Sequence, residues 1–167
     1  GTNRTGYVEV YQRHPQNGWI QLGQTIYGEV TDDNYSGNGE FFGYSVGIDT
    51  VGSTTILAVA APNRYGPLGP RQGVVLTYVY DTETSATDPQ WTPLGQELWG
   101  ESGGDLLGFS LTLQANTLAI GSPFNEGFVG DEIVNIGNAP LMRGLGAGNV
   151  RVFVYADSKW HPLGQDI

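Results

Sequence analysis

The apolar residues of this chain fall in short runs separated by turn-forming residues. In residues 148–155, the valines Val150, Val152 and Val154 take every second position. This alternation is typical of a β-strand, because successive side chains of a strand point to opposite faces. Since no stretch of ten or more residues places apolar side chains at helical spacing, the pattern predicts an all-β protein.

One short motif occurs three times. The pattern Trp-x-x-Leu-Gly-Gln occupies residues 19–24, 91–96 and 160–165, at spacings of 72 and 69 residues. Each copy is followed two positions later by an aliphatic residue, namely Ile26, Leu98 and Ile167. Self-similarity at a fixed period is the signature of a repeat architecture, so this spacing predicts that the chain is built from repeated units of about seventy residues.

Other segments repeat in the same phase and complete a unit of four strands. A Val-rich segment precedes each tryptophan, at residues 6–11, 73–80 and 148–155. Four antiparallel strands per unit, repeated radially, form the blade of a β-propeller. We expect about two and a half blades: residues 1–40 hold the third and fourth strands of an incomplete blade, 41–106 form a blade, and 107–167 form a blade with an inserted loop at 124–147.

The first two strands of each unit carry a recognisable pair of motifs. Phe42-Gly43 precedes Ala60-Ala61-Pro62, and Leu107-Gly108 precedes Gly121-Ser122-Pro123. This order resembles the FG-GAP repeat of integrin α chains and related surface proteins. With the Trp-x-x-Leu-Gly motif, it looks like the version in secreted or surface proteins of aquatic microbes. The resemblance implies a propeller and a place at the cell surface.

Many FG-GAP repeats carry an aspartate-rich calcium loop between their first two strands. The matching segments here are 49–54, which holds the single carboxylate of Asp49, and 113–117, which holds none. A calcium ion takes six to eight oxygen ligands, several of them charged. We therefore expect the usual calcium loop to be absent and predict no cofactor, with calcium the one cofactor left open.

Two and a half blades cannot close a ring, because a propeller normally has four or more. The hydrophobic faces and sheet edges of an open row would stay exposed. The expected partners are therefore other propeller segments of the same protein or other copies of the chain, together with a protein or glycan ligand.

Charge and composition narrow the possible functions and cellular locations of the protein. The formal net charge of −10, with only seven Lys and Arg residues, disfavours nucleic-acid binding. No apolar run is long enough to span a membrane, and there is no cysteine for a disulfide or a thiol site. The glycosylation sequons at Asn3 and Asn34 favour an extracellular or cell-surface location.

The inserted loop at 124–147 is the first candidate binding site, since loops on a rigid scaffold often carry function. Its candidate binding residues are Asn125, Glu126, Asp131, Glu132, Met142 and Arg143. The alternative is a packing loop that covers a neighbouring blade, because the segment is also rich in apolar residues.

Two further candidates lie outside that loop. Asp32, Asn34 and Ser36 place oxygen ligands at alternate positions, as in the first half of a calcium loop, but an ordinary Asn/Gly turn has the same composition. Tyr27 and Trp99 occupy one repeat position and could stack on sugar rings. By contrast, the tryptophans of the repeated motif are expected to pack between blades; these are Trp19, Trp91 and Trp160.

No catalytic motif is visible, so the sequence predicts that the protein is not an enzyme. The leading hypothesis is a structural or adhesive protein-interaction module of a surface or matrix assembly. The alternative is a carbohydrate-binding propeller lectin. An enzyme with a site at the propeller axis is the weakest hypothesis.

Overall fold

The computed structural model describes residues 5–29, 39–81, 89–125, 135–136, 139–140, 147–165 and 167. Within these residues there is no helix, and strands make up 52%. All the paired strands are antiparallel, so the all-β prediction is confirmed. No helix in the described part of the chain is long and apolar enough to cross a membrane.

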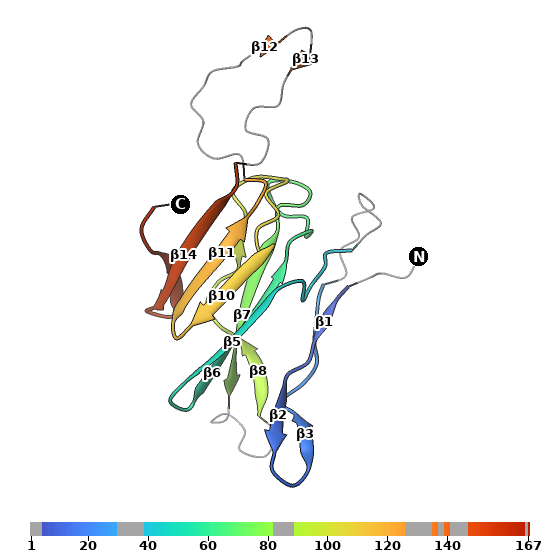
Figure 1. Cartoon of the computed structure of the whole chain (residues 1–167), viewed down its shortest axis with the longest axis vertical. Helices are drawn as coiled ribbons and strands as arrows, with labels where there is room; N and C mark the ends of the chain where they lie inside the picture. The colour runs from blue at the N-terminus through green and yellow to red at the C-terminus, as the bar shows by residue number, and fades with distance from the viewer. Residues whose placement is uncertain are drawn as a thin grey trace.

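A central sheet follows the predicted strand order. It consists of β5 (Val46–Val51), β6 (Thr54–Ala61), β7 (Val74–Asp81) and β8 (Gln90–Pro93), in that order, and β9 (Leu98–Trp99) also pairs with β7. The Trp-x-x-Leu-Gly motif begins within its fourth strand, β8. Figure 1 shows β5, β6 and β7 running through the middle of the molecule.

A second sheet repeats this order and is called the C-terminal sheet. Its strands are β10 (Ser110–Gln114), β11 (Thr117–Ser122), β14 (Asn149–Ala156) and β15 (Lys159–Pro162). The short strands β12 (Asn135–Ile136) and β13 (Ala139–Pro140) pair with each other. None of the sheets formed by the described strands closes into a barrel or ring.

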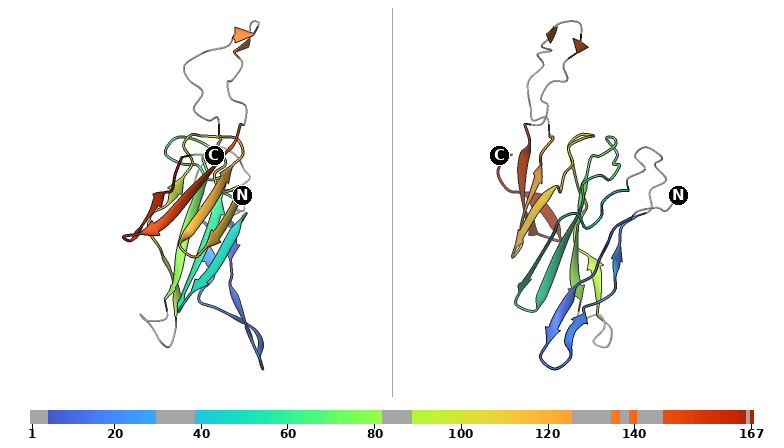
Figure 2. Two further views of the ribbon diagram at one scale, coloured as in Figure 1. Left: turned by 60° about the vertical axis from the view of Figure 1, so that its left-hand side comes forward. Right: turned by 45° about the vertical axis from the view of Figure 1, so that its right-hand side comes forward.

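The N-terminal strands form two short pairs. β1 (Tyr7–Val8) pairs with β4 (Ile26–Tyr27), and β2 (Tyr11–His14) pairs with β3 (Gly18–Gln21). Figure 2 shows these strands on one side of the central sheet and the C-terminal sheet on the other.

The repeat extends to the register of the strands. Val8 is paired with Ile26 in the N-terminal strands, as Val75 is with Leu98 in the central sheet. In the C-terminal sheet, Val150 and Ile167 exchange two backbone hydrogen bonds of 3.0 and 3.2 Å. Residues that match in the sequence period therefore occupy matching places in three successive units.

The hydrophobic core lies on both faces of the central sheet, and β6 is buried from Ile56 to Ala61. One face of β6, with Ile56, Ala58 and Ala60, packs against the C-terminal sheet. The opposite face packs against residues of the N-terminal strands. Burying both faces of one strand explains its continuous apolar sequence.

Small residues allow the sheets to approach closely. A Cβ atom on Gly108 would lie 2.6 Å from the Cβ of Ala60, which leaves no room for a side chain. Gly108 also has a φ of 87°, in the left-handed region that favours glycine. The Phe/Leu-Gly motif is thus a turn that seats one sheet on the next.

Candidate functional site

The tryptophan of the central sheet is bound by the unit before it. The Trp91 indole N–H donates a hydrogen bond of 2.7 Å to the Leu22 carbonyl oxygen. The side chain of Gln24 accepts from the Trp91 backbone N–H and donates to the Trp91 carbonyl oxygen, both at 2.8 Å. One glutamine amide thus replaces a missing neighbouring strand along the edge of β8.

The C-terminal sheet repeats this interlock. Gln96 donates a bond of 2.7 Å to the Trp160 carbonyl oxygen and accepts one of 3.0 Å from its backbone N–H. The Trp160 indole donates to the Thr77 hydroxyl at 2.8 Å, and that hydroxyl donates to the Leu94 carbonyl oxygen. The second copy therefore reaches the leucine carbonyl through a threonine side chain.

A glycine forms the floor of each tryptophan site. Gly23 has a φ of 70°, and a Cβ there would lie 2.8 Å from Cδ1 of Trp91. Gly95 has a φ of 69°, and a Cβ there would lie 3.0 Å from Cδ1 of Trp160. The Leu-Gly-Gln part of the motif is therefore a socket, which receives the tryptophan of the following unit.

The row of units leaves the tryptophan of the first copy and the Leu-Gly-Gln turn of the third copy without partners among the described residues. Trp91 and Trp160 are 3% and 2% exposed, as the sequence predicted, but Trp19 is 70% exposed. The prediction that Trp19 packs between blades is wrong for this chain, because no Leu-Gly-Gln turn of the described residues lies beside it. At the other end, Gly164 has a φ of 82° and no atom within 4 Å of a Cβ placed on it.

The outer face of the C-terminal sheet, which points away from the central sheet, is exposed in the same way. Val150 is 39% exposed, whereas its counterpart Val75 in the central sheet is fully buried. Ile167 is 84% exposed, whereas its counterpart Leu98 is 6% exposed. Positions that are buried on the central sheet are therefore exposed to solvent on the C-terminal sheet.

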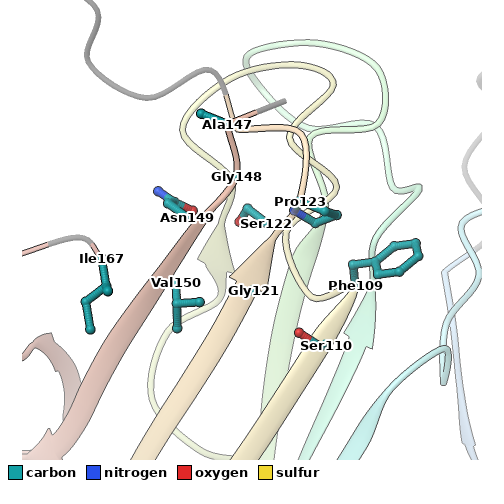
Figure 3. A pocket seen from close by; sticks show the side chains of 10 residues that line it. All are labelled: Phe109, Ser110, Gly121, Ser122, Pro123, Ala147, Gly148, Asn149, Val150 and Ile167. Carbon is teal, nitrogen blue, oxygen red and sulfur yellow. The ribbon is translucent and has the colours of Figure 1, made fainter. Parts of the chain in front are cut away.

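A cavity of about 360 Å³ opens on this outer face (Figure 3). Ser110, Gly121, Val150 and Ile167 contribute to its lining. On the central sheet, the equivalent place is filled by Gly108, whose carbonyl oxygen accepts a 2.7 Å hydrogen bond from the Ser45 hydroxyl. The cavity therefore lies at the position that a Phe/Leu-Gly turn occupies on the central sheet.

A polar cluster lies at the loop end of the central sheet. Arg64 is 5% exposed; it forms ion pairs with Glu29 and, at 3.6 Å, with Glu40. Its guanidinium lies 5.5 Å from the ring centroid of Trp99. Because the arginine is buried between these partners, the cluster serves the packing of the unit.

The next unit has the same cluster with an amide in place of the guanidinium. Asn125 donates hydrogen bonds of 3.1 Å to Glu101 and to Asp105. Asn125 is 4% exposed, and its carbonyl oxygen accepts a bond of 3.0 Å from the Gly148 N–H. This residue of the predicted binding loop therefore closes the base of the loop.

Most of the other predicted binding and metal residues lie outside the described residues. These are Glu126, Asp131, Glu132, Met142 and Arg143 of the inserted loop, Asp32, Asn34 and Ser36 of the suggested calcium turn, and the sequon residues Asn3 and Asn34. The binding, metal and glycosylation hypotheses for these positions remain predictions.

Tyr27 and Trp99 occupy equivalent strand positions but differ in surroundings. Tyr27 is 68% exposed, and its ring centroid lies 6.1 Å from that of Tyr7. Trp99 is partly buried, and Arg64 lies over its ring. Sugar stacking remains a prediction for both, with Tyr27 the more accessible ring.

The one carboxylate at the calcium-loop position forms hydrogen bonds within the protein. Asp49 accepts them from the Ala115 and Thr50 backbone N–H groups, at 2.6 and 2.8 Å. These bonds, that from Ala115 first, lower the pKa of the Asp49 carboxyl. Asp49 thus links the central and C-terminal sheets. Among the described residues, no group of three or more His, Cys, Asp or Glu side chains could hold a metal ion.

The sequence did contain the signal for the interlock, but its chemistry was not predicted. Each copy of the motif ends in a glutamine; these are Gln24, Gln96 and the exposed Gln165. A polar side chain that is kept in phase with a buried tryptophan indicates a contact between units. Comparison with protein-family models and with curated proteins finds no match for this chain.

Proposed function

We propose that this chain is a non-catalytic extracellular structural or adhesive module, built from propeller-type units of the FG-GAP kind. The observation that carries the proposal is the outer face of the C-terminal sheet. Its residues Val150 and Ile167 are exposed at positions whose equivalents are buried against a neighbouring sheet. Such a face is suited to bind a protein, because an uncovered apolar sheet face gains free energy when it is covered.

The propeller-type assignment is supported by the way in which successive sheets meet. Each four-stranded unit packs face to face on the preceding unit and is held by the same tryptophan and glutamine. The small residues Ala60 and Gly108 bring the sheets close, as adjacent blades require. Repeat proteins of this kind gain stability from the contacts between neighbouring units.

An extended chain tests the proposal directly. A copy of residues 99–167, appended after Ile167, would continue the repeat in phase. We expect the added unit to cover the outer face, slow amide exchange at Val150 and raise the free energy of unfolding. A matched control carries Leu107→Glu in the appended copy only, and should lose both effects. If the unaltered extension leaves exchange and stability unchanged, the proposal is wrong.

The extracellular part of the proposal is tested separately. The sequons at Asn3 and Asn34 would carry glycan in a protein that passes through a eukaryotic secretory route. The intact mass of the natural protein, measured before and after enzymatic deglycosylation, gives the occupancy. A secreted origin with glycan at either site supports the assignment, and recovery of the protein from the cytosol contradicts it.

A lectin is the second candidate, and one observation favours it. Tyr7 and Tyr27 form an exposed aromatic pair, with 61% and 68% of their surfaces accessible. Exposed aromatic rings can stack on sugar rings. A glycan array should then give binding that Tyr27→Ala abolishes and that Tyr65→Ala, at a 44% exposed position elsewhere, leaves intact. Silence across the array would discard the lectin.

A further inference from the structure

In the part of the chain that the structure describes, one tryptophan socket is unfilled and one tryptophan of the repeated motif is unbound. The socket is formed by Leu163, Gly164 and Gln165, the third copy of the sequence whose first two copies bind Trp91 and Trp160. The unbound tryptophan is Trp19, on the fourth-strand position of the N-terminal strands. We propose that Trp19 of one molecule binds this socket in a second copy of the chain, so that copies associate head to tail.

The free socket has the features of the two filled ones. Gly164 has a left-handed φ like Gly23 and Gly95, and as a glycine it places no side chain on the floor of the socket. The Leu163 N–H donates to the Val152 carbonyl oxygen at 2.7 Å, as the Leu22 N–H donates to Val10 at 2.7 Å. The turn is therefore already held in the receiving geometry, and its glutamine is exposed.

Trp19 is presented in the register that binding needs. It is paired with Arg13 across the β2–β3 hairpin, as Trp91 is paired with Tyr80 and Trp160 with Tyr155. All eight residues of β2 and β3 are exposed, and the hairpin projects from the body of the molecule (Figure 1). No rearrangement of the described strands is required to expose the indole.

A second copy of the chain is the occupant that these features specify. Each molecule carries both halves of the contact, on opposite sides of the central sheet (Figure 2). In the bound state, Gln165 would hold the Trp19 backbone N–H and carbonyl, as Gln24 holds those of Trp91. Because the two halves are different surfaces, the association produces a ring or an open chain instead of a two-fold dimer.

The inference rests on the proposed function, since it extends the internal stacking of units to a contact between molecules. The two can fail separately. The appended-unit experiment measures docking within one chain, whereas the experiment below measures association of the unaltered chain. An extension that docks, together with an unaltered chain that never associates, overturns the inference alone.

Sedimentation velocity tests the contact on the full chain over a wide concentration range, at physiological salt so that the net charge of −10 is screened. The unaltered chain should associate in a concentration-dependent way. Trp19→Ala should weaken the association about 30-fold or more, as for a central aromatic of an interface. Leu163→Glu, at a 53% exposed position, should do the same by placing a charge in the socket. Tyr65→Ala is the matched control and should associate normally.

A mixture of the two defective chains gives the sharpest result. The Trp19→Ala chain keeps its socket and the Leu163→Glu chain keeps its tryptophan, so an equimolar mixture should form one-to-one dimers that grow no further. Far-UV circular dichroism of each variant should match that of the unaltered chain, because both positions are exposed. Three results would overturn the proposal: a chain that stays monomeric throughout, association that survives Trp19→Ala, or association that Trp19→Ala abolishes and Leu163→Glu does not.

Discussion

The same substitution at two equivalent tryptophans should have very different costs. Trp19 and Trp160 occupy one position of the repeat, but Trp160 is 2% exposed and Trp19 is 70% exposed. Only Trp160 has a filled socket, which is formed by the turn at Gly95 and the side chain of Gln96. Trp160→Ala and Trp19→Ala therefore measure what the neighbouring unit contributes, with the local sequence motif held constant.

The structure sets the expected magnitudes. Removal of a buried tryptophan side chain costs about 3–5 kcal/mol, which covers lost apolar contact and the cavity left behind. This loss includes the indole hydrogen bond to Thr77, which is worth roughly 1 kcal/mol. Thr77 keeps its own bond to the Leu94 carbonyl oxygen, so no unpaired hydroxyl donor adds to the cost. At Trp19, an exposed surface position, the expected cost is within about 0.5 kcal/mol.

Urea unfolding followed by far-UV circular dichroism gives the measurement. It should be done at low protein concentration, so that any association through Trp19 does not add to stability. Trp160→Phe is the control that keeps an aromatic ring and loses the indole N–H, and it should fall between the other two variants. Equal costs for Trp160→Ala and Trp19→Ala would refute the argument that the neighbouring unit decides the role of this residue.

Two further predictions follow from other contacts between the sheets. Gln96→Ala should lower the free energy of unfolding by about 1–3 kcal/mol, because it leaves backbone groups of Trp160 unpaired, whereas Gln165→Ala in the unassociated chain should be nearly neutral in the same urea titration. Asp49→Asn should flatten the loss of stability in acid, measured by unfolding over a pH series. The lowered pKa of Asp49 means that its contribution is present above the unfolded pKa of about 4 and is lost as pH falls through the folded value; an unchanged pH profile would contradict the Asp49 link.

The strands and their order could be predicted because their signals are local. Alternating valines in residues 148–155 predicted β14. The repeated Trp motif predicted the fourth strand of each unit, and Trp91 and Trp160 do lie in β8 and β15. Ala60 and Gly108 were small in the sequence, and the structure places them in contact between sheets. Each of these features depends on the spacing or the size of side chains, and both can be obtained from the sequence alone.

The site was harder to predict because it depends on neighbours that lie far away in the chain. Asn125 was a candidate binding residue of the inserted loop, and the structure shows that its amide donates hydrogen bonds to Glu101 and Asp105 inside the unit. Trp99 was a candidate for sugar stacking, and the structure places Arg64, 35 residues earlier in the chain, over its ring. A sequence gives the residue type but not the partner, and the partner decides whether a polar or aromatic side chain faces solvent.

The sequence by itself determined that this protein is all-β and that its units repeat in phase, because strand period and motif spacing are properties of the chain alone. Only the tertiary structure decided that Trp91 and Trp160 are buried while Trp19 is exposed. Three identical residues acquire two different roles because burial is a property of a contact between units. A tryptophan is buried only where the socket of another unit lies beside it.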